Sequence, residues 1–343
     1  MFFDDYISYF VLFITLNCFY GYHRLKQAYK NKKYYRHLLE FPKEYKYYMT
    51  NIDSISKSEI LVQKMKYFLN KTKIPNNNII VSLSGGVDSM VILSILLFLR
   101  YRYKYKLNIF TASIDYSQRK ESRDEIKFIK FYCRYHHVRN YSKKVENLKR
   151  KKGRKKFEET SRNIRFDLYK NIMKERGYAY VFLGHHKDDL NENIFNNLLR
   201  GRTLLDLEVM KEISENNDVK LCRPFLNNFK TDIYDFAHRY NIPYFLDTTP
   251  KWSNRGKMRN EIFPLLDSVY GISWKRNLLK QGKDSTIFNN IINDSIINPI
   301  VEKWEIKENN YSIELEEDNN YNLIIWSEVL KKIMHLNGHN KLS

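Results

Sequence analysis

The chain has 343 residues, 43% of them hydrophobic, which is enough for one sizeable domain with additions or for two small domains. With 59 basic and 39 acidic residues its formal net charge is +20, which favours a polyanionic partner such as nucleic acid, with a general drift in composition as the alternative. The three cysteines (Cys18, Cys133 and Cys222) are scattered, which excludes a disulfide framework and a paired-cysteine metal or cluster site and indicates a reducing compartment.

The first candidate element is Tyr6 to Tyr22, an uncharged and mostly apolar segment. Its length is at the lower end of the roughly 17–25 residues that cross a bilayer. Acidic residues precede it and basic residues follow it, unlike a secretory signal, which favours a membrane anchor or targeting segment with the rest of the chain on the cytoplasmic side. A hydrophobic helix packed on the main domain is the alternative. We therefore expect residues 1–55 to form a hydrophobic segment and a basic linker, in a protein of the cytoplasm or of an organelle matrix.

A helix is predicted over Ser58 to Leu69, and the clearest signal of the chain follows it. Ile79 to Leu83 is short, apolar and β-branched, as in a buried parallel strand, and Met90 to Leu99 has the length and apolar character of a helix. The polar turn between them reads Ser84-Gly85-Gly86-Val87-Asp88-Ser89.

This turn has the chemistry of a phosphate-binding loop. Glycines permit a tight turn and the close approach of a ligand, and the N–H groups and positive dipole end of the following helix attract an anion. Ser84 and Ser89 add hydroxyl donors, whereas Asp88 repels a phosphate unless a cation lies between them. The sequence therefore predicts a pyrophosphate cradle with a Mg²⁺ bridge at Asp88, distinct from the Walker type. An ordinary strand–turn–helix connection with a capped helix is the alternative.

The loop resembles the Ser-Gly-Gly-x-Asp-Ser motif of the N-type ATP pyrophosphatases, the PP-loop enzymes, which cleave ATP to AMP and pyrophosphate. The resemblance implies an α/β fold with a doubly wound, mostly parallel sheet, ATP and Mg²⁺ as cofactors, and contact of residues 84–89 with the ATP phosphates. The strand predicted over Leu107 to Ile114 ends in Ser113 and Asp115. The resemblance places these two residues near the adenine and ribose, although a simple β-turn explains them equally well.

Two charged segments come next. A surface helix is predicted over Arg119 to Tyr135, and the basic run Lys143 to Lys156 is either a solvated loop or a clamp for RNA phosphates. A further helix places Glu158, Arg162 and Arg165 within one or two turns of each other, which by itself is an ordinary ion pair. The segment nevertheless resembles the Glu-Glu-x-Ala-Arg-x-x-Arg-Tyr motif of tRNA(Ile)-lysidine synthetases and 2-thiocytidine synthetases. That resemblance implies contact of both arginines with RNA or substrate.

The second strong signal follows the strand predicted over Tyr178 to Leu183. It reads Gly-His-His-Lys-Asp-Asp-Leu-Asn-Glu-Asn from Gly184 to Asn193 and opens a helix that runs to Leu199. Histidine and carboxylates at the carboxyl end of a parallel strand lie where chemistry occurs in such sheets. We expect His185 and Asp188 to face the nucleotide and Asp189 to cap the helix.

This segment resembles the His-x-x-Asp-Asp-x-x-Glu-Thr motif of the same enzymes, and Arg200-Gly201 resembles the Arg-Gly at the end of their helix. GMP and NAD synthetases lack this pattern, so the resemblance narrows the choice to the tRNA-modifying branch. It implies that Glu192 orients or binds the ammonium of lysine and that Arg200 contacts RNA or the activated intermediate. The residues to which it gives catalytic roles are Asp88, His185, Asp188, Asp189 and Glu192.

Three later segments resemble the same enzymes. Arg223-Pro224 resembles their Arg-Pro pair, which implies an RNA or substrate contact for Arg223. Asn241 to Asp247 resembles their Gly-Ile-Pro-x-x-x-Asp, and Ser253 to Ile262 their Ser-Asn followed by Arg-Asn-x-Ile. The chain departs from the pattern here, because extra residues follow Asp247 and Phe263 replaces an arginine. These positions help to form the substrate side of the pocket, so the departures bear on the exact substrate and on activity.

The resemblance extends from Ile79 to Leu266. We expect a PP-loop ATP pyrophosphatase domain over residues 56–266 and a small α+β extension of unknown role over residues 267–343. Within the extension we expect helices over Trp274 to Ile300 and Tyr321 to Leu336, with one or two strands over Trp304 to Leu315.

Together the motifs imply an ATP-dependent ligase with tRNA and free lysine as partners. As in the lysidine synthetases, it would adenylate the wobble cytidine of tRNA(Ile) and join lysine to C2, releasing AMP and pyrophosphate. One alternative is a tRNA thiolase of the same superfamily, which the scattered cysteines oppose. Another is a catalytically decayed nucleic-acid-binding homologue, which the altered substrate segment favours and the intact ATP loop opposes.

Overall fold

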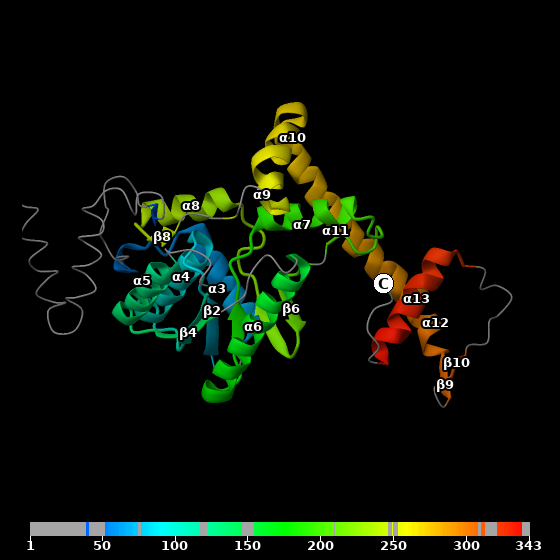
Figure 1. Cartoon of the computed structure of the whole chain (residues 1–343), viewed down its shortest axis with the longest axis horizontal. Helices are drawn as coiled ribbons and strands as arrows, with labels where there is room; N and C mark the ends of the chain where they lie inside the picture. The colour runs from blue at the N-terminus through cyan, green and yellow to red at the C-terminus, as the bar shows by residue number, and fades with distance from the viewer. Residues whose placement is uncertain are drawn as a thin grey trace, which may run out of the picture. The chain divides into compact units, whose positions relative to one another are not determined.

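The computed structural model describes residues 39–40, 52–74, 77–116, 122–145, 154–208, 210–245, 249, 253–307, 310–312 and 321–337. Its contacts divide the chain into two compact units, the first Met1–Asp188 with Lys211–Pro250 and the second Asp189–Met210 with Lys251–Ser343 (Figure 1). The predicted apolar segment Tyr6 to Tyr22 and the centre of the basic run, residues 146–153, lie outside the described residues. None of the helices that are described has the length and apolar character needed to cross a membrane.

The first unit is built on a six-stranded sheet in the order β4-β3-β2-β5-β7-β6. The strands are β2 (Asn78–Ser82), β3 (Asn108–Asp115), β4 (Arg139–Lys144), β5 (Tyr180–Phe182), β6 (Ile213–Asn216) and β7 (Val219–Cys222). The first five in this order are parallel, and only β6 runs antiparallel to its neighbour. Strand β2 pairs with β3 on one side and β5 on the other, so the predicted phosphate loop follows an interior strand.

Alternate residues of β2 face two different apolar layers, as its pleat requires. Ile79 and Val81 are fully buried against one layer of helices, whereas Ile80 is buried with residues of α6 on the other face. The helices of the first unit are α3 (Ile60–Thr72), α4 (Val87–Arg102), α5 (Ser122–Tyr135), α6 (Arg154–Arg176) and α8 (Lys230–Arg239). Since both faces of the parallel sheet are covered by helices, the predicted α/β architecture is confirmed.

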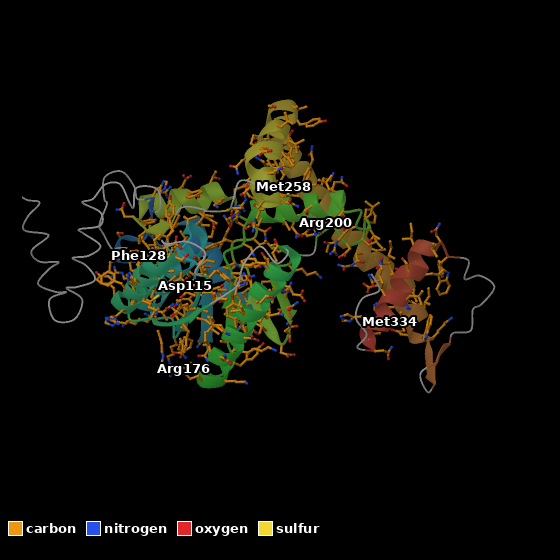
Figure 2. The ribbon with its side chains drawn as sticks, viewed as in Figure 1. Asp115, Phe128, Arg176, Arg200, Met258 and Met334 are labelled. Carbon is orange, nitrogen blue, oxygen red and sulfur yellow. The ribbon has the colours of Figure 1, made fainter. Side chains whose placement is uncertain are left out.

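A small antiparallel pair joins the ends of this unit. Strand β1 (Leu39–Glu40) pairs with β8 (Tyr244–Phe245), with Leu39 opposite Phe245. The Phe245 ring packs edge-on against that of Phe128 in α5 at 5.4 Å between centroids; Figure 2 labels Phe128. The segment that follows α8 therefore packs against β1 and α5 of this unit.

The second unit is mostly helical. It contains most of α7 (Lys187–Leu199), followed by α9 (Asn254–Lys257), the π-helical segment η4 (Met258–Ile262), α10 (Phe263–Tyr270), α11 (Ser273–Ile292), the π-helical segment η5 (Asn293–Ile297), α12 (Asn298–Glu302) and α13 (Leu323–Leu336). A short antiparallel hairpin, β9 (Glu305–Lys307) with β10 (Asn310–Ser312), confirms the strands predicted near the C-terminus.

Two apolar clusters hold the second unit together. Phe195 of α7 packs against Phe263, which in turn packs against Trp274 with 4.9 Å between the ring centroids. Near the C-terminus, Val329 and Ile333 of α13 are buried against the segment that precedes the hairpin. The predicted division into residues 56–266 and 267–343 stays a prediction.

One buried histidine makes the stability of the first unit depend on pH. His136 is 5% exposed, follows α5 and packs its ring 4.5 Å from that of Tyr132. Burial, and then the positive charge of Arg100, lower the pKa of His136 from 6.5 to about 4. The native state therefore holds a neutral imidazole, and this side chain gains a proton on unfolding.

Because the pKa of His136 is lower in the folded than in the unfolded state, the unfolded state binds more protons as the pH falls from 6.5 to about 4. We expect the free energy of unfolding to fall by on the order of 3 kcal/mol across that range. Urea denaturation at about pH 7 and pH 4.5 measures it. The variant His136→Phe should lose most of this dependence, whereas the exposed His137→Asn should keep it; an equally steep dependence in both would contradict the assignment.

Candidate active site

The loop between β2 and α4 has its shape fixed by main-chain contacts with β8. Gly85 has a φ of +84°, a conformation that residues with a side chain rarely adopt. A Cβ at Gly85 would also lie 2.5 Å from the Phe245 ring. The Phe245 N–H donates a hydrogen bond of 2.8 Å to the Gly85 carbonyl, and Phe245 forms a parallel bridge with Gly86. The glycine is therefore required by packing as well as by the turn.

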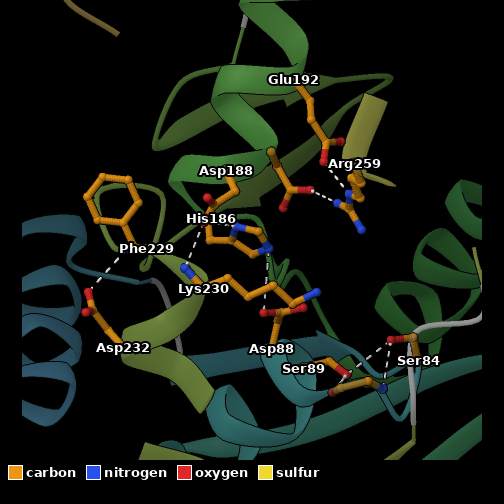
Figure 3. A network of polar contacts seen from close by, with 12 residues as sticks. Ser84, Asp88, Ser89, His186, Asp188, Glu192, Phe229, Lys230, Asp232 and Arg259 are labelled. Carbon is orange, nitrogen blue, oxygen red and sulfur yellow. Dashed lines mark hydrogen bonds and ion pairs between the residues drawn. The ribbon is translucent and has the colours of Figure 1, made fainter. Parts of the chain in front are cut away.

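Hydrogen bonds of the two serine hydroxyl groups stabilise the loop (Figure 3). Ser89 donates to the Gly86 carbonyl at 3.0 Å, and the Gly86 N–H donates to the Ser84 hydroxyl at 3.3 Å. The two hydroxyls lie 3.3 Å apart. The N–H groups of the first turn of α4 have no acceptors within the helix, and Ser84 is exposed, so an anion from solvent can reach this end of α4.

Asp88 lies in the first turn of α4, against the turn that follows β5. A Cβ at Gly184 would lie 2.7 Å from the Cβ of Asp88, so the two turns touch only because residue 184 is a glycine. His186 lies between two carboxylates, with its Nε2 3.8 Å from Asp88 and its Nδ1 3.4 Å from Asp188 (Figure 3). The sequence reasoning did not single out His186; the only signal was its place as the second histidine of the motif.

Asp188 supports the start of α8. Its Oδ2 accepts a hydrogen bond of 2.8 Å from the Lys230 N–H, the first residue of that helix. One carboxylate oxygen of Asp188 therefore stabilises the start of α8. Contact of Asp188 with a nucleotide stays a prediction. Helix α7 begins at Lys187, so the prediction that Asp189 caps this helix was wrong. Asp189 lies within the first turn, where its carboxylate forms ion pairs instead.

His185 is oriented by Arg223. The Arg223 Nε donates to the His185 Nδ1 at 3.0 Å, so a neutral His185 carries its proton on Nε2. Arg223 also donates to the Lys211 carbonyl at 2.7 Å and to the Ser214 hydroxyl at 2.9 Å, and it is 8% exposed. Burial lowers the pKa of Arg223, and the nearby Arg162 lowers it further. Since its hydrogen-bond acceptors among the described residues are neutral, this corner of the first unit suits an anion.

The end of β3 is closed by α6. Ser113 is 1% exposed, and its hydroxyl accepts a hydrogen bond of 2.8 Å from the Asn140 amide, so it lies inside the fold. Asp115, labelled in Figure 2, is the last residue of the strand and is 9% exposed. Burial raises the pKa of Tyr116, while Arg165 and the Ser161 hydroxyl of α6 act in the opposite direction. Arg165 is therefore close to the carboxyl edge of the sheet.

Two further predicted residues, Asp189 and Glu192, form ion pairs within the second unit. Their carboxylates are buried and contact the guanidinium groups of Arg255 and Arg259 (Figure 3 shows Glu192 with Arg259). Arg200, labelled in Figure 2, follows the end of α7 and is exposed. The sequence reasoning missed Arg255 because its partners lie more than 60 residues earlier in the chain.

The residues of the loop fit a magnesium ion bound together with phosphates. No group of three or more histidine, cysteine or acidic side chains in the described part of the chain is arranged to hold a metal by itself. Mg²⁺ in nucleotide enzymes usually takes one or two carboxylates and completes its shell with phosphate oxygens and water. Asp88 is the one carboxylate of the loop, next to the N–H groups of α4.

A parallel sheet that carries a glycine- and serine-rich loop between an interior strand and the next helix defines a nucleotide-binding α/β domain. Residues 57–266 match the family of PP-loop domains, and the chain belongs to this family. Membership implies that the domain binds ATP.

Curated relatives include the tRNA(Ile)-lysidine synthases of Enterococcus faecalis, 30% identical over 194 residues, and of Thermotoga maritima, 30% identical over 223 residues. These matches cover 56% and 61% of this chain but 41% and 52% of the relatives, so the chain spans about half the length of the curated relatives that it matches. Among solved structures, the U34-tRNA thiolase NcsA from Methanococcus maripaludis superposes with a TM-score of 0.52 at 16% identity, covering 69% of this chain and 79% of that chain. This last likeness shows the fold alone.

Substitution of two glycines of the site distinguishes an effect on packing from an effect on ligand binding. A Cβ at Gly184 must displace Asp88, whereas at Gly86 its nearest neighbour is the Ser84 hydroxyl at an ordinary 3.4 Å. We expect Gly184→Ala to lower the free energy of unfolding by about 1–3 kcal/mol and to weaken ATP binding. We expect Gly86→Ala to leave stability within about 0.5 kcal/mol but to weaken ATP binding roughly tenfold. Thermal unfolding and calorimetric titration with ATP measure both; equal stability of the two variants would contradict the packing argument.

Proposed function

We propose that this chain is an ATP-dependent tRNA-modifying ligase that converts the wobble cytidine of tRNA(Ile) to lysidine. The observation that carries the proposal is the pairing of the phosphate loop with the turn after β5, where His186 lies between Asp88 and Asp188. The curated relatives named tRNA(Ile)-lysidine synthase support the choice of reaction, and the net charge of +20 supports a nucleic-acid substrate.

The first half of the reaction activates the cytidine. Its C2 oxygen attacks the α-phosphorus of ATP, the bond from that phosphorus to the α,β-bridging oxygen breaks, and pyrophosphate leaves with that oxygen. Ser84, Ser89 and the N–H groups at the start of α4 bind the phosphates. Asp88 would hold Mg²⁺, which when bound would neutralise charge on the phosphate oxygens. Asp115 lies at the carboxyl edge of β3 for contact with the nucleoside, whereas the Ser113 hydroxyl is buried and accepts a hydrogen bond from Asn140.

The second half joins lysine. The neutral amine attacks C2, AMP leaves with the former C2 oxygen, and the amine proton passes to solvent or to a nearby base. The Nε2–H of His185, oriented by Arg223, is a donor for an oxygen of the activated intermediate. Glu192 and Asp189 bind an ammonium group of lysine. The cations proposed to contact RNA or the intermediate are Arg162, Arg165, Arg200 and Arg223.

The cysteines argue against the thiolase alternative. Thiol chemistry needs a thiolate, and burial raises the pKa of Cys133 to about 11 and that of Cys222 to about 12. Both thiols are therefore protonated at neutral pH and closed to solvent. Cys18 lies outside the described residues.

We also propose membrane contact through residues 6–22, on the evidence of the sequence alone.

The first test is release of AMP and pyrophosphate from ATP by the purified full chain with bulk tRNA, with and without free lysine. We expect AMP release to require both tRNA and lysine, because the adenylated cytidine is discharged only by the amine. AMP release that needs tRNA but ignores lysine would assign a different nucleophile. Failure to turn over ATP under any of these conditions would support the decayed, binding-only alternative.

Replacement of Asp88 tests the phosphate loop. We expect Asp88→Ala to reduce tRNA-dependent AMP release by roughly 100-fold or more, because the cation that neutralises the phosphates loses its protein ligand. The thermal midpoint should stay close to that of the parent chain. Asp53→Ala, an exposed carboxylate 3.7 Å from Arg102, is the matched control and should keep full turnover. Unchanged turnover in Asp88→Ala would overturn the proposed role of the loop.

A further inference from the structure

Four charged side chains of the second unit form an ion-pair network. Arg255 of α9 donates from Nε to Glu192 at 2.5 Å and from a terminal nitrogen to Asp189. Arg259 of η4 donates to Asp189 at 3.1 Å and also bonds Glu192. Each carboxylate therefore contacts both guanidinium groups.

The two arginines differ in how firmly they are enclosed. The carboxylate side chains are only 6% and 7% exposed, and the Arg259 side chain is 22% exposed, but the Arg255 side chain is 47% exposed. Buried carboxylates need a cation, because an uncompensated charge in the interior costs several kcal/mol. Arg259 is held as part of the unit, whereas solvent reaches Arg255. If Arg255 moves away, the two buried carboxylates lose one of their cations, and the vacated place accepts one monovalent cation.

We infer that Arg255 is a resident cation that occupies the subsite of the α-ammonium group of the amino-acid substrate. Binding of lysine displaces its guanidinium from Asp189 and Glu192, so Arg255 sets the affinity for the amino acid. This inference rests on the proposed function. It deepens that function by naming a residue that limits substrate binding and the group of the substrate that replaces it.

The chemistry assigns the α-ammonium, not the side-chain ammonium, to this subsite. The nucleophile that attacks C2 must be a neutral amine, because an ammonium has no lone pair. A carboxylate pair stabilises the charged form of an amine and raises its pKa. An amine held between Asp189 and Glu192 therefore stays protonated and cannot be the nucleophile. The side-chain amine reacts, and the α-ammonium anchors the molecule.

A purely structural ion pair is the competing explanation. In that case Arg255 only ties α9 to α7, and its removal leaves a buried charge that no substrate relieves. The two explanations differ in what free amino acid does to a variant that lacks Arg255. Only the subsite explanation lets an added ammonium take the vacated place.

The test compares Arg255→Met with Arg202→Met in the full chain. Arg202 forms an ion pair with Asp206 in the same unit, and both side chains of this pair are about half exposed, so it controls for loss of an arginine charge. Calorimetric titration and thermal shift use three probes: lysine, norleucine, which keeps only the α-ammonium, and 6-aminohexanoate, which keeps only the distal ammonium. We expect Arg255→Met to bind lysine and norleucine roughly tenfold more tightly and to gain more thermal stability from them, with 6-aminohexanoate unchanged.

The outcomes that overturn the inference are distinct. Unchanged or weaker lysine binding by Arg255→Met would show a structural pair, and a gain for 6-aminohexanoate but not norleucine would overturn the α-ammonium assignment. If Arg255→Met does not fold, Arg255→Lys keeps a charge without the two-pronged contact and should show a smaller gain in lysine affinity. Failure of the parent chain and both variants to bind lysine would contradict the proposed function itself. In the AMP-release assay with tRNA, Arg255→Met should lower the KM for lysine and leave the KM for ATP unchanged.

Discussion

The hydrogen bond from the Phe245 N–H to the Gly85 carbonyl is the contact on which the architecture of the first unit depends. It joins two segments 160 residues apart: the phosphate loop, which ends an interior strand, and β8, which follows the last helix of the unit. The positive φ of Gly85 points that carbonyl towards β8, and the Phe245 ring fills the space that a side chain at residue 85 would need. The loop is therefore shaped before a ligand arrives, which reduces the entropy lost on binding.

The structure places the arginines that contribute to the net charge in two kinds of environment. Arg259 and Arg255 are neutralised by buried carboxylates within the second unit. Arg223 is buried but meets neutral acceptors and lies near Arg162, so its charge is available to an anionic group. Charge totals from the sequence do not distinguish these cases, because they depend on which carboxylates the fold brings near.

Much of the first unit follows from local sequence. Strands β2 and β3, helix α4 and the loop after β2 were predicted because apolar runs and turn residues act within a few positions of each other. Strand β4 was not predicted: its residues Arg139 to Lys144 are mostly polar, and it lies at the edge of the sheet, where pairing on one side suffices. The antiparallel β6–β7 hairpin was missed for a similar reason, since Ile213 to Asn216 is short and polar.

The candidate site was predictable where a motif is continuous and not where partners are distant. The loop residues and the turn after β5 were predicted from the sequence, but the contacts that each of their side chains makes were not. Asp188 supports α8, and Asp189 pairs with arginines 66 and 70 residues away, contacts that no local pattern encodes. The tautomer of His185 likewise depends on Arg223, which directly follows β7, nearly 40 residues later in the chain.

The π-helical segment η4 carries a consequence for how this chain tolerates insertions and deletions. A π-turn holds one more residue than an α-turn, so η4 delays every later side chain by about 100° around the helix axis. Arg259 lies inside it, and Phe263 with its aromatic partner Trp274 comes after it. Loss of a single residue there would yield a regular α-helix in which the later side chains, including those of the aromatic cluster, keep their direction, because the wide turn has already absorbed one residue. The π-turn therefore lets the second unit carry one additional residue without a change in the direction of the side chains that follow.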